Sequence, residues 1–284
     1  MKKILIVPNK IKDNGLLETK KVVKKLSLLG LYTYALSKHV DKGELDVSIE
    51  EEITNDTDLI VVIGGDGSVI DASGDAIALD IPILGVNLGN VGYLAEVDPD
   101  KLNLFDRLIS GDYFVNEKML LLADCQELRE CMGGERFAVN DIVLSYDGTL
   151  GISGIKIEDQ EGSSLRYRVD GLIFSTSQGS TAYSLSAGGP ILAHGVEGIV
   201  VSPVAPHSFF NRSVIFNADE VITVTNVGQK ALNLCVDGRY YGKLVPETSY
   251  KIRRAEKKIK MIAFSKNTTF SNLFKKIRVL EDID

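Results

Sequence analysis

The residues whose types and spacing most clearly suggest a chemical role are Gly64-Gly65-Asp66-Gly67. Glycines let backbone N–H groups approach a phosphate closely. An aspartate there would repel a phosphate charge about 4 Å away by roughly 4 kcal/mol at an effective dielectric near 20. A loop that only cradled phosphates would avoid this charge, and the Gly-x-x-x-x-Gly-Lys-Ser/Thr motif of passive phosphate loops is missing. The aspartate is explained if Asp66 takes a proton from an attacking hydroxyl group, or helps to hold Mg²⁺ between donor phosphates. Both roles indicate phosphoryl transfer to an alcohol, whereas a tight turn that merely needs glycine is the simpler alternative.

A second group of candidate residues lies between Asp170 and Pro190, where a strand pattern ends in a run rich in hydroxyl groups around Gly179-Ser180-Thr181-Ala182-Tyr183. Hydroxyl and backbone groups can bind a sugar or an amide, and Tyr183 offers a surface for stacking. Composition alone favours a plain Ser/Thr-rich loop.

The elements around the glycine loop predict where it lies in the fold. Five apolar residues, 59–63, form the strongest strand pattern and end at the loop, and residues 68–79 follow with helical spacing. Further strands are expected at residues 3–7, 31–36 and 83–86, and a helix at 14–29. This alternation predicts an α/β domain with an open, mostly parallel sheet and helices on both faces, in which ligands bind at the carboxyl ends of the strands.

The pattern changes near residue 99, and from about residue 112 it consists of short strands and turns. Strands are expected at residues 119–125, 137–145, 154–158, 171–175, 220–226, 231–236 and 260–264. We therefore predict an α/β domain over residues 1–98 and an all-β domain over residues 99–264, largely antiparallel and of sandwich or layered type. Residues 270–276 have helical spacing again.

Composition limits the partners and the compartment. The 284 residues are 44% apolar and 25% charged, with a net charge of −7, so no general basic field favours nucleic acid. No apolar run approaches the roughly 18 residues that cross a bilayer, so no membrane partner is expected. The three cysteines have no metal-ligand spacing, which is typical of free thiols in the cytoplasm. An anionic ligand must therefore be bound by local donors, and Asn9 and Lys10, just after the first strand, could reach phosphates.

Several motifs together resemble one family. They are the Gly-Gly-Asp-Gly loop at 64–67, the Asn140-Asp141 pair that opens a strand, the segment 170–190, and shorter matches at 84–94, 202–208 and 236–238. In this order and spacing they resemble the bacterial NAD kinases over most of the chain. The resemblance implies transfer of the γ-phosphate of ATP to the 2′-hydroxyl of the adenosine ribose of NAD. It also implies a divalent cation, expected to be Mg²⁺, without dedicated protein ligands. A homodimer or homotetramer is implied too, as is a C-terminal segment, about 265–284, that returns to the first domain.

The resemblance also assigns roles to residues. Asp66 would be the base that deprotonates the 2′-hydroxyl group, with Gly67 beside it, and Asn140 and Asp141 would hold the adenosine. The remaining positions implied for the NAD pocket are Tyr93 against adenine, Arg168 near the negative charge of NAD, Asp170 on the nicotinamide side, Thr181, Ala182, Tyr183, Ser184, Leu185, Ser186, Ala205, and Asp237 in a region that contacts a neighbouring subunit. The chain departs from the usual family pattern at Asp141, at Ser177-Gln178 and at Arg239.

Two other functions share parts of this pattern. Lipid kinases of the diacylglycerol type have a Gly-Gly-Asp-Gly loop and a β domain, but Asn140-Asp141 and the 179–183 run argue against that acceptor. A non-catalytic NAD sensor would gain nothing from the repulsive charge of Asp66. The sequence therefore favours an NAD kinase.

Overall fold

A computed structural model describes residues 1–89, 92–124, 136–146, 151–193 and 195–265. The chain forms two compact units, the first made of residues 1–118 with 259–265 and the second of residues 119–258. The expected C-terminal return at about 265–284, together with Cys125 and Cys131, falls almost entirely outside the described residues. Among the described residues, none of the helices combines the length and the apolar character needed to cross a membrane.

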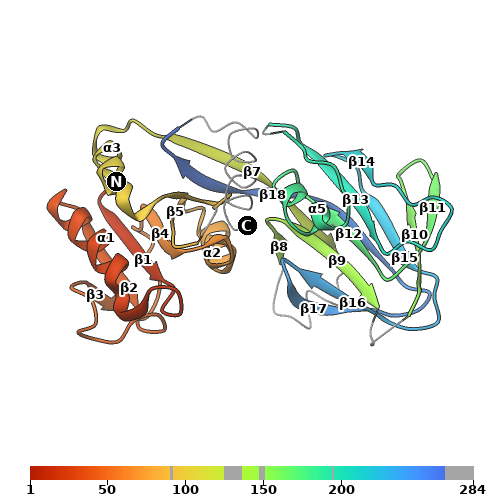
Figure 1. Ribbon diagram of the computed structural model, residues 1–284, viewed down its shortest axis with the longest axis horizontal. Helices are drawn as coiled ribbons and strands as arrows, with labels where there is room; N and C mark the ends of the chain where they lie inside the picture. The colour runs from red at the N-terminus through yellow and green to blue at the C-terminus, as the bar shows by residue number, and fades with distance from the viewer. Residues whose placement is uncertain (90–91, 125–135, 147–150, 194, 266–284) are drawn as a thin grey trace, which may run out of the picture. The chain divides into compact units, whose positions relative to one another are not determined.

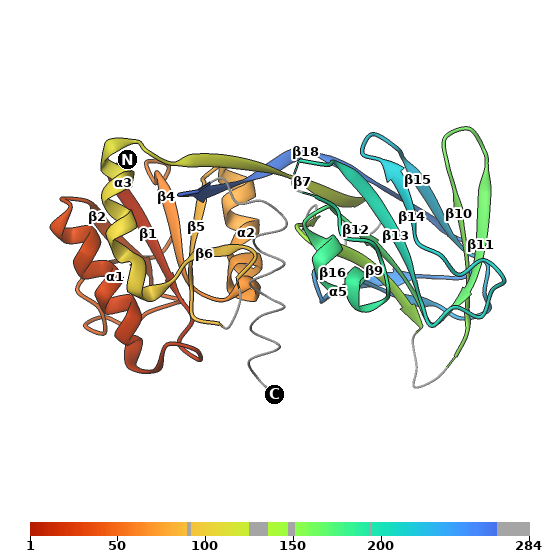
Figure 2. The same ribbon diagram turned by 45° about the horizontal axis from the view of Figure 1, so that its top comes forward.

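The first unit contains a parallel sheet with the strand order β5-β4-β1-β2-β3, and β6 pairs parallel to β5. Its elements are β1 (Lys3–Pro8), η1 (Asn14–Leu16), α1 (Leu17–Leu28), β2 (Tyr32–Leu36), β3 (Ser48–Glu50), β4 (Leu59–Gly64), α2 (Asp66–Leu79), β5 (Ile83–Asn87), β6 (Ala95–Val97), η2 (Pro99–Phe105) and α3 (Asp106–Ser110). Helices α1 and α3 lie on one face of the sheet and α2 on the other, as Figures 1 and 2 show. The predicted α/β fold class is confirmed.

Burial explains why β4 carries the strongest pattern. Every residue of β4 is buried, because the strand lies between β1 and β5 and is covered on both faces. Helix α1 buries Val22, Val23 and Leu26 against this sheet. Phe105 and Leu108 of η2 and α3 join the same core, which is why residues 99–110 belong to the first unit.

The second unit is a two-layered β structure. The strands that lie in it, β7 and β18 only in part, are β7 (Phe114–Asp124), β8 (Phe137–Ala138), β9 (Asp141–Tyr146), β10 (Ser153–Glu158), β11 (Ser164–Val169), β12 (Gly171–Ser175), β13 (Gly198–Val204), β14 (Val214–Asn217), β15 (Ile222–Asn226), β16 (Leu232–Val236), β17 (Arg239–Leu244) and β18 (Ser249–Ala263). It also contains two short helices, η3 (Gly179–Thr181) and α5 (Tyr183–Ser186). One sheet has the order β14-β13-β12-β9-β16-β17, and the opposing layer contains β11-β10-β15-β18. Their pairings are antiparallel, and alternate side chains of both layers form a single apolar core. The predicted all-β class is confirmed.

The crossings between the units occur within two strands, β7 and β18. The unit boundaries lie between residues 118 and 119 and between 258 and 259, whereas the expected divisions followed residues 98 and 264. A strand that continues without interruption carries no turn or change of composition, so its sequence does not mark such a crossing.

One expected strand is interrupted. Residues 137–145 form β8 and β9, separated at Val139 and Asn140. The cause is Asp237, whose carboxylate accepts the N–H groups of Val139, Asn140 and Asp141 and so removes them from the strand ladder.

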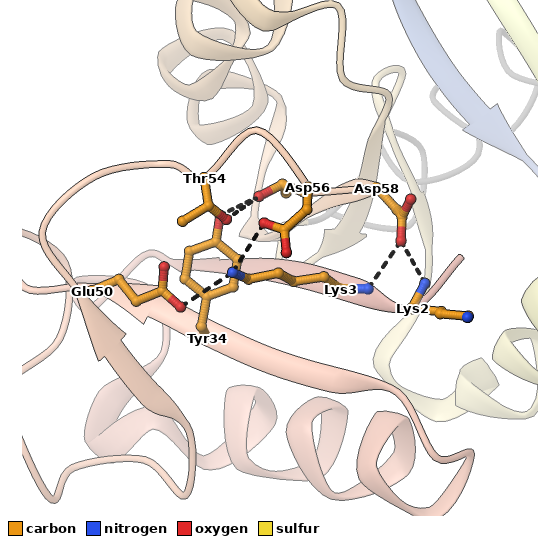
Figure 3. A network of polar contacts seen from close by, with 8 residues as sticks. Lys2, Lys3, Tyr34, Glu50, Thr54, Asp56 and Asp58 are labelled. Atoms are coloured by element: carbon orange, nitrogen blue, oxygen red, sulfur yellow. Dashed lines mark hydrogen bonds and ion pairs between the residues drawn. The ribbon is translucent and has the colours of Figure 1, made fainter.

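A polar network binds the beginning of β1, at the end of the parallel strands opposite the glycine loop (Figure 3). The Lys3 ammonium group lies 4.9 Å from the centre of the Tyr34 ring and forms ion pairs with Asp56 at 3.1 Å and Glu50 at 3.4 Å. Oδ2 of Asp58 accepts the N–H groups of Lys2 and Lys3 at 2.5 and 3.0 Å. These contacts join β1 to β2, β3 and the start of β4, so we assign the network a structural role.

Candidate active site

Asp66 is the first residue of α2 and directly follows the glycines that end β4. Its Oδ2 accepts the N–H of Tyr93 at 3.0 Å, and its Oδ1 accepts those of Leu94 and Ala95 at 2.9 and 3.1 Å. A carboxylate has about four lone-pair positions, so one position on Oδ2 is left for a further donor. Asp66 is therefore fixed in orientation while it keeps the capacity to accept a proton.

The glycines of the loop have different structural requirements. A Cβ at Gly64 would lie 2.3 Å from Oγ of Ser68 and 2.6 Å from its Cβ. Ser68 cannot simply move away, because its Oγ accepts a hydrogen bond from Nδ2 of Asn9 at 2.8 Å. Gly65 has extended backbone angles, φ −113° and ψ −170°, which any residue adopts. Gly64 is thus needed for close packing, and Gly65 is not needed for its conformation.

The nearest described cation to the loop is not the one that the sequence suggested. Lys10 forms ion pairs with Glu44 at 2.7 Å and with Asp41 at 3.4 Å. The ammonium group of Lys12 lies 2.7 Å from the position that a Cβ on Gly65 would occupy. Sequence patterns did not single out Lys12, although it follows β1 at the carboxyl edge of the sheet, where ligands of parallel sheets bind.

In the second unit, Asn140 and Asp141 lie in a turn that is bound by two other parts of the chain. The Asp237 carboxylate accepts the N–H groups of Val139, Asn140 and Asp141 at 2.7, 2.8 and 3.0 Å. Thr176 binds the same turn, with its N–H donating to the Asn140 carbonyl at 2.9 Å and its Oγ1 donating to the Val139 carbonyl at 2.7 Å. The structure therefore brings Asn140, Asp141 and Asp237 together, and gives Asp237 a role within its own chain.

Glycine is required where the hydroxyl-rich segment meets this turn. A Cβ at Gly179 would lie only 2.0 Å from the Asn140 carbonyl oxygen. The close approach places η3 directly beside the Asn140-Asp141 turn, so two of the predicted motifs are neighbours in the fold.

The two carboxylates of this cluster influence each other. Asp141 is 5% exposed, and burial together with the negative charge of Asp237 raises the pKa of Asp141 to about 7. Burial also raises the pKa of Asp237, but three N–H donors and the Arg239 charge oppose that rise. The negative charge therefore resides on Asp237, and Asp141 is the carboxyl group that holds a proton near neutral pH.

The 181–186 segment contains residues of two kinds. Ser184 is fully buried, and its hydroxyl shares a 2.9 Å hydrogen bond with that of Ser202 on β13. Thr181 is also buried, with its Oγ1 donating to the Gln178 carbonyl. Tyr183 and Ser186 are exposed, whereas Ala182 and Leu185 are half-buried. Tyr183 and Ser186 thus present surface for a ligand, whereas Ser184 and Thr181 hold the segment in place.

Arg168, Asp170 and Ala205 form a separate group at the other end of β12. The Asp170 N–H donates to the Val204 carbonyl at 3.1 Å, and the His207 N–H donates to the Arg168 carbonyl at 2.7 Å. Nε2 of His207 lies 3.8 Å from Oδ1 of Asp170. Because β12 separates Asp170 from Thr176, the two groups lie about 20 Å apart along the strand, at roughly 3.3 Å per residue.

Comparison with known families agrees with this arrangement. A family model described as the ATP-NAD kinase N-terminal domain matches residues 7–113, and one described as the ATP-NAD kinase C-terminal domain matches residues 139–264. An NAD kinase of Lachnoclostridium phytofermentans is 32% identical over 278 residues, which cover 95% of this chain and 96% of that protein. An NAD kinase of a Geobacter species is 35% identical over 285 residues, or 98% of this chain and 99% of the relative.

Solved structures share the fold. An NAD kinase from Archaeoglobus fulgidus in complex with ATP has a TM-score of 0.72 at 22% identity, covering 98% of this chain and 99% of the other. A yeast NADH kinase complexed with NADH has a TM-score of 0.78 at 21% identity, covering 99% of this chain and 86% of the other.

A glycine loop with a fixed aspartate on a parallel sheet, joined to a β unit that carries a second polar cluster, defines a phosphotransferase of two units. The chain belongs to the NAD kinase family, and it is an ATP-dependent NAD kinase. The family resemblance stated from the motifs is confirmed, and neither the lipid kinase nor the sensor alternative gains support from these matches.

The contrast between Gly64 and Gly65 gives a stability prediction. Gly64→Ala should lower the free energy of unfolding by about 1–3 kcal/mol, because the added methyl group collides with a Ser68 side chain fixed by Asn9. Gly65→Ala should be close to neutral, because the nearest atom is the end of a flexible lysine. Urea unfolding of both variants tests this, and equal destabilisation of the two would contradict the assigned packing.

The Asp141–Asp237 pair predicts a pH effect on stability. Because the folded-state pKa of Asp141 is raised from 3.8 to about 7, its contribution to stability is complete below about pH 4 and is lost as the pH rises through 7. Asp141→Asn removes that loss, so the variant should exceed the wild type by about 1–4 kcal/mol at pH 8 and by much less at pH 5. Denaturant titrations at both pH values check this, with exposed Asp46→Asn as control. A difference that does not depend on pH would refute the assignment.

Proposed function

We propose that Asp66 is the general base of the reaction. The 2′-oxygen of NAD forms a bond to the γ-phosphorus of ATP, the bond from that phosphorus to the bridging oxygen breaks, ADP leaves, and the 2′-hydroxyl proton passes to Oδ2 of Asp66. The observation that carries this proposal is the open acceptor position on an otherwise fully bonded carboxylate. A base needs such a position within hydrogen-bond reach of its proton.

We further propose that the 64–67 loop binds the phosphates of ATP. Helix α2, which extends from Asp66 to Leu79, has its partial positive end at this loop. Gly67 is exposed, so the backbone of the loop is accessible at that position.

The divalent cation, which we expect to be Mg²⁺, is best explained as arriving with ATP. Among the described residues, no three His, Cys, Asp or Glu side chains gather into a metal site. Mg²⁺ commonly keeps several waters and binds substrate phosphates with only one or two carboxylates, so the donor set fits a cation held mainly by ATP. When bound, it would neutralise charge on the phosphates.

For NAD, we propose that contact and positioning roles belong to different residues. Asn140, Asp141, Tyr183 and Ser186 are the contact candidates, together with Ala182, Leu185, Gly67 and Tyr93. Ser184, Thr181 and Asp237 support them, since their polar atoms bind other parts of the chain. A protonated Asp141 could donate to a ribose hydroxyl as well as accept from one, whereas an ionised carboxylate can only accept.

The separation of Arg168, Asp170 and Ala205 from the Asn140 cluster favours a homodimer or homotetramer. A group about 20 Å away along β12 is better placed to complete the NAD site of another subunit than that of its own. We also propose a cytoplasmic location, in keeping with Cys235 as a free thiol.

The role of Asp66 predicts a specific kinetic result. Asp66→Asn should slow NADP formation from NAD, ATP and Mg²⁺ by about 10²–10⁴, because the base is lost. The Asn side-chain oxygen can still accept the Leu94 and Ala95 N–H groups, so the fold should persist, and ATP binding should hold or tighten as repulsion is removed. Asp75→Asn, on the exposed face of the same helix, is the control. A rate within a factor of about two of the wild type would exclude Asp66 as the base.

The shared site predicts complementation between inactive chains. Asp66→Asn and Asp170→Asn variants should each be impaired alone. If the two variants are mixed in equal amounts and their chains pair at random into dimers, about a quarter of the sites would combine an intact Asp66 with an intact Asp170 from the other subunit. Co-refolding followed by an NADP assay measures this, and a mixture no more active than its components would refute the arrangement.

A further inference from the structure

The loop that follows β1 fixes the backbone of Lys12. Oδ1 of Asn9 accepts the N–H groups of Ile11 and Lys12, both at 3.1 Å, and the Asn9 carbonyl accepts that of Asp13 at 2.9 Å. Through Nδ2, the same Asn9 binds Ser68 in the first turn of α2. One side chain therefore sets the position of the Lys12 backbone relative to the glycine loop.

Asp13 holds the other side of Lys12. It is 3% exposed, and its carboxylate accepts the N–H groups of Glu18 and Thr19 at 3.0 and 2.8 Å and the Thr19 hydroxyl at 2.6 Å. These bonds anchor the loop to the start of α1. Lys12 thus extends from a backbone that is fixed on both sides.

The side chain of Lys12 reaches across the loop. Its Nζ lies 2.7 Å and its Cε 3.9 Å from the position of a Cβ on Gly65. Within the described part of the chain, Lys12 forms no ion pair, whereas Lys10, two residues earlier, is paired with Glu44 and Asp41. The ammonium group therefore lies beside Gly65 with its donors available.

The negative charge of the loop would be offset by such a cation. Residues 64–67 contain one acid and no basic side chain, and an ATP phosphate bound there would be repelled by Asp66. An ammonium group at a similar distance offsets that repulsion, and lysine binds phosphate as a point charge.

We propose that Lys12 is a substrate-binding residue whose ammonium group contacts a phosphate of ATP at the glycine loop. The proposal rests on the assignment of that loop to ATP. It also explains Gly65, whose backbone angles suit any residue: a side chain at this position would occupy the space of the Lys12 ammonium group.

The test compares Lys12→Gln with Lys10→Gln, a matched control from the same loop, by calorimetric titration with ATP, ADP and adenosine in the presence of Mg²⁺. Lys12→Gln should weaken ATP binding by about ten- to a hundredfold, as expected for a lost charge-assisted hydrogen bond. Adenosine affinity should stay within about twofold, while Lys12→Arg should recover much of the loss for ATP. Lys10→Gln should bind all three ligands as the wild type does.

An ATP affinity within about twofold of the wild type in Lys12→Gln would overturn the proposal. So would an equal loss for adenosine, because a general disturbance of the site does not discriminate by phosphate. Binding is measured without NAD, so it tests the role of Lys12 even if the wild type forms no NADP. A wild type that forms no NADP would instead count against the proposed function. In the steady state, KM for ATP should rise with KM for NAD unchanged.

Discussion

In each unit, a carboxylate that accepts three successive backbone N–H groups organises the cluster of candidate residues. Asp66 binds the N–H groups of residues 93–95, and Asp237 binds those of residues 139–141, with one bond to Oδ2 and two to Oδ1 in both cases. Each aspartate fixes a stretch of chain that would otherwise need a partner strand for its donors. The loop before β6 and the turn between β8 and β9 depend on these two side chains.

The two aspartates differ in their surroundings, which suits them to the different roles that we propose, Asp66 as the base and Asp237 as a support for Asn140 and Asp141. Asp66 heads a helix behind a glycine loop, where a phosphate can approach and one acceptor position stays open. Asp237 lies in the two-residue turn between β16 and β17, where φ is 47° at Asp237 and 74° at Gly238. Positive φ at both positions is typical of a type I′ hairpin and turns the carboxylate back onto its own chain. Burial and the negative charge of the neighbouring Asp237 raise the pKa of Asp141, so Asp141 binds a proton more readily than an exposed aspartate does.

Much of this fold could be predicted from local patterns, because buried parallel strands such as β4 are continuous apolar runs between turn residues. The short edge strands β3 and β14 gave no comparable signal, since their residues are exposed or only half-buried. The interruption at Val139 and Asn140 could not be predicted from local patterns either. It is caused by the carboxylate of Asp237, which lies 96–98 residues later in the sequence. The motifs predicted Asp66, Asn140 and Asp141 as site residues, and this stays a prediction. Which of the 181–186 hydroxyl groups is buried depends on β13, a tertiary neighbour.

Lys10 and Lys12 show where sequence reasoning about charge reaches its limit. Both follow β1 at the carboxyl edge of the sheet, and nothing local distinguishes their side chains. The distinction arises from Glu44 and Asp41, which bind Lys10, and from Asn9, which connects the loop of Lys12 to the first turn of α2. If Asp66 is the base, as we propose, a cation must offset its charge beside the phosphates. A cation within the loop itself could pair with Asp66 and occupy its open position. A lysine from the neighbouring strand meets both demands, because it lies over Gly65 while the Asp66 carboxylate stays bound to the N–H groups of residues 93–95.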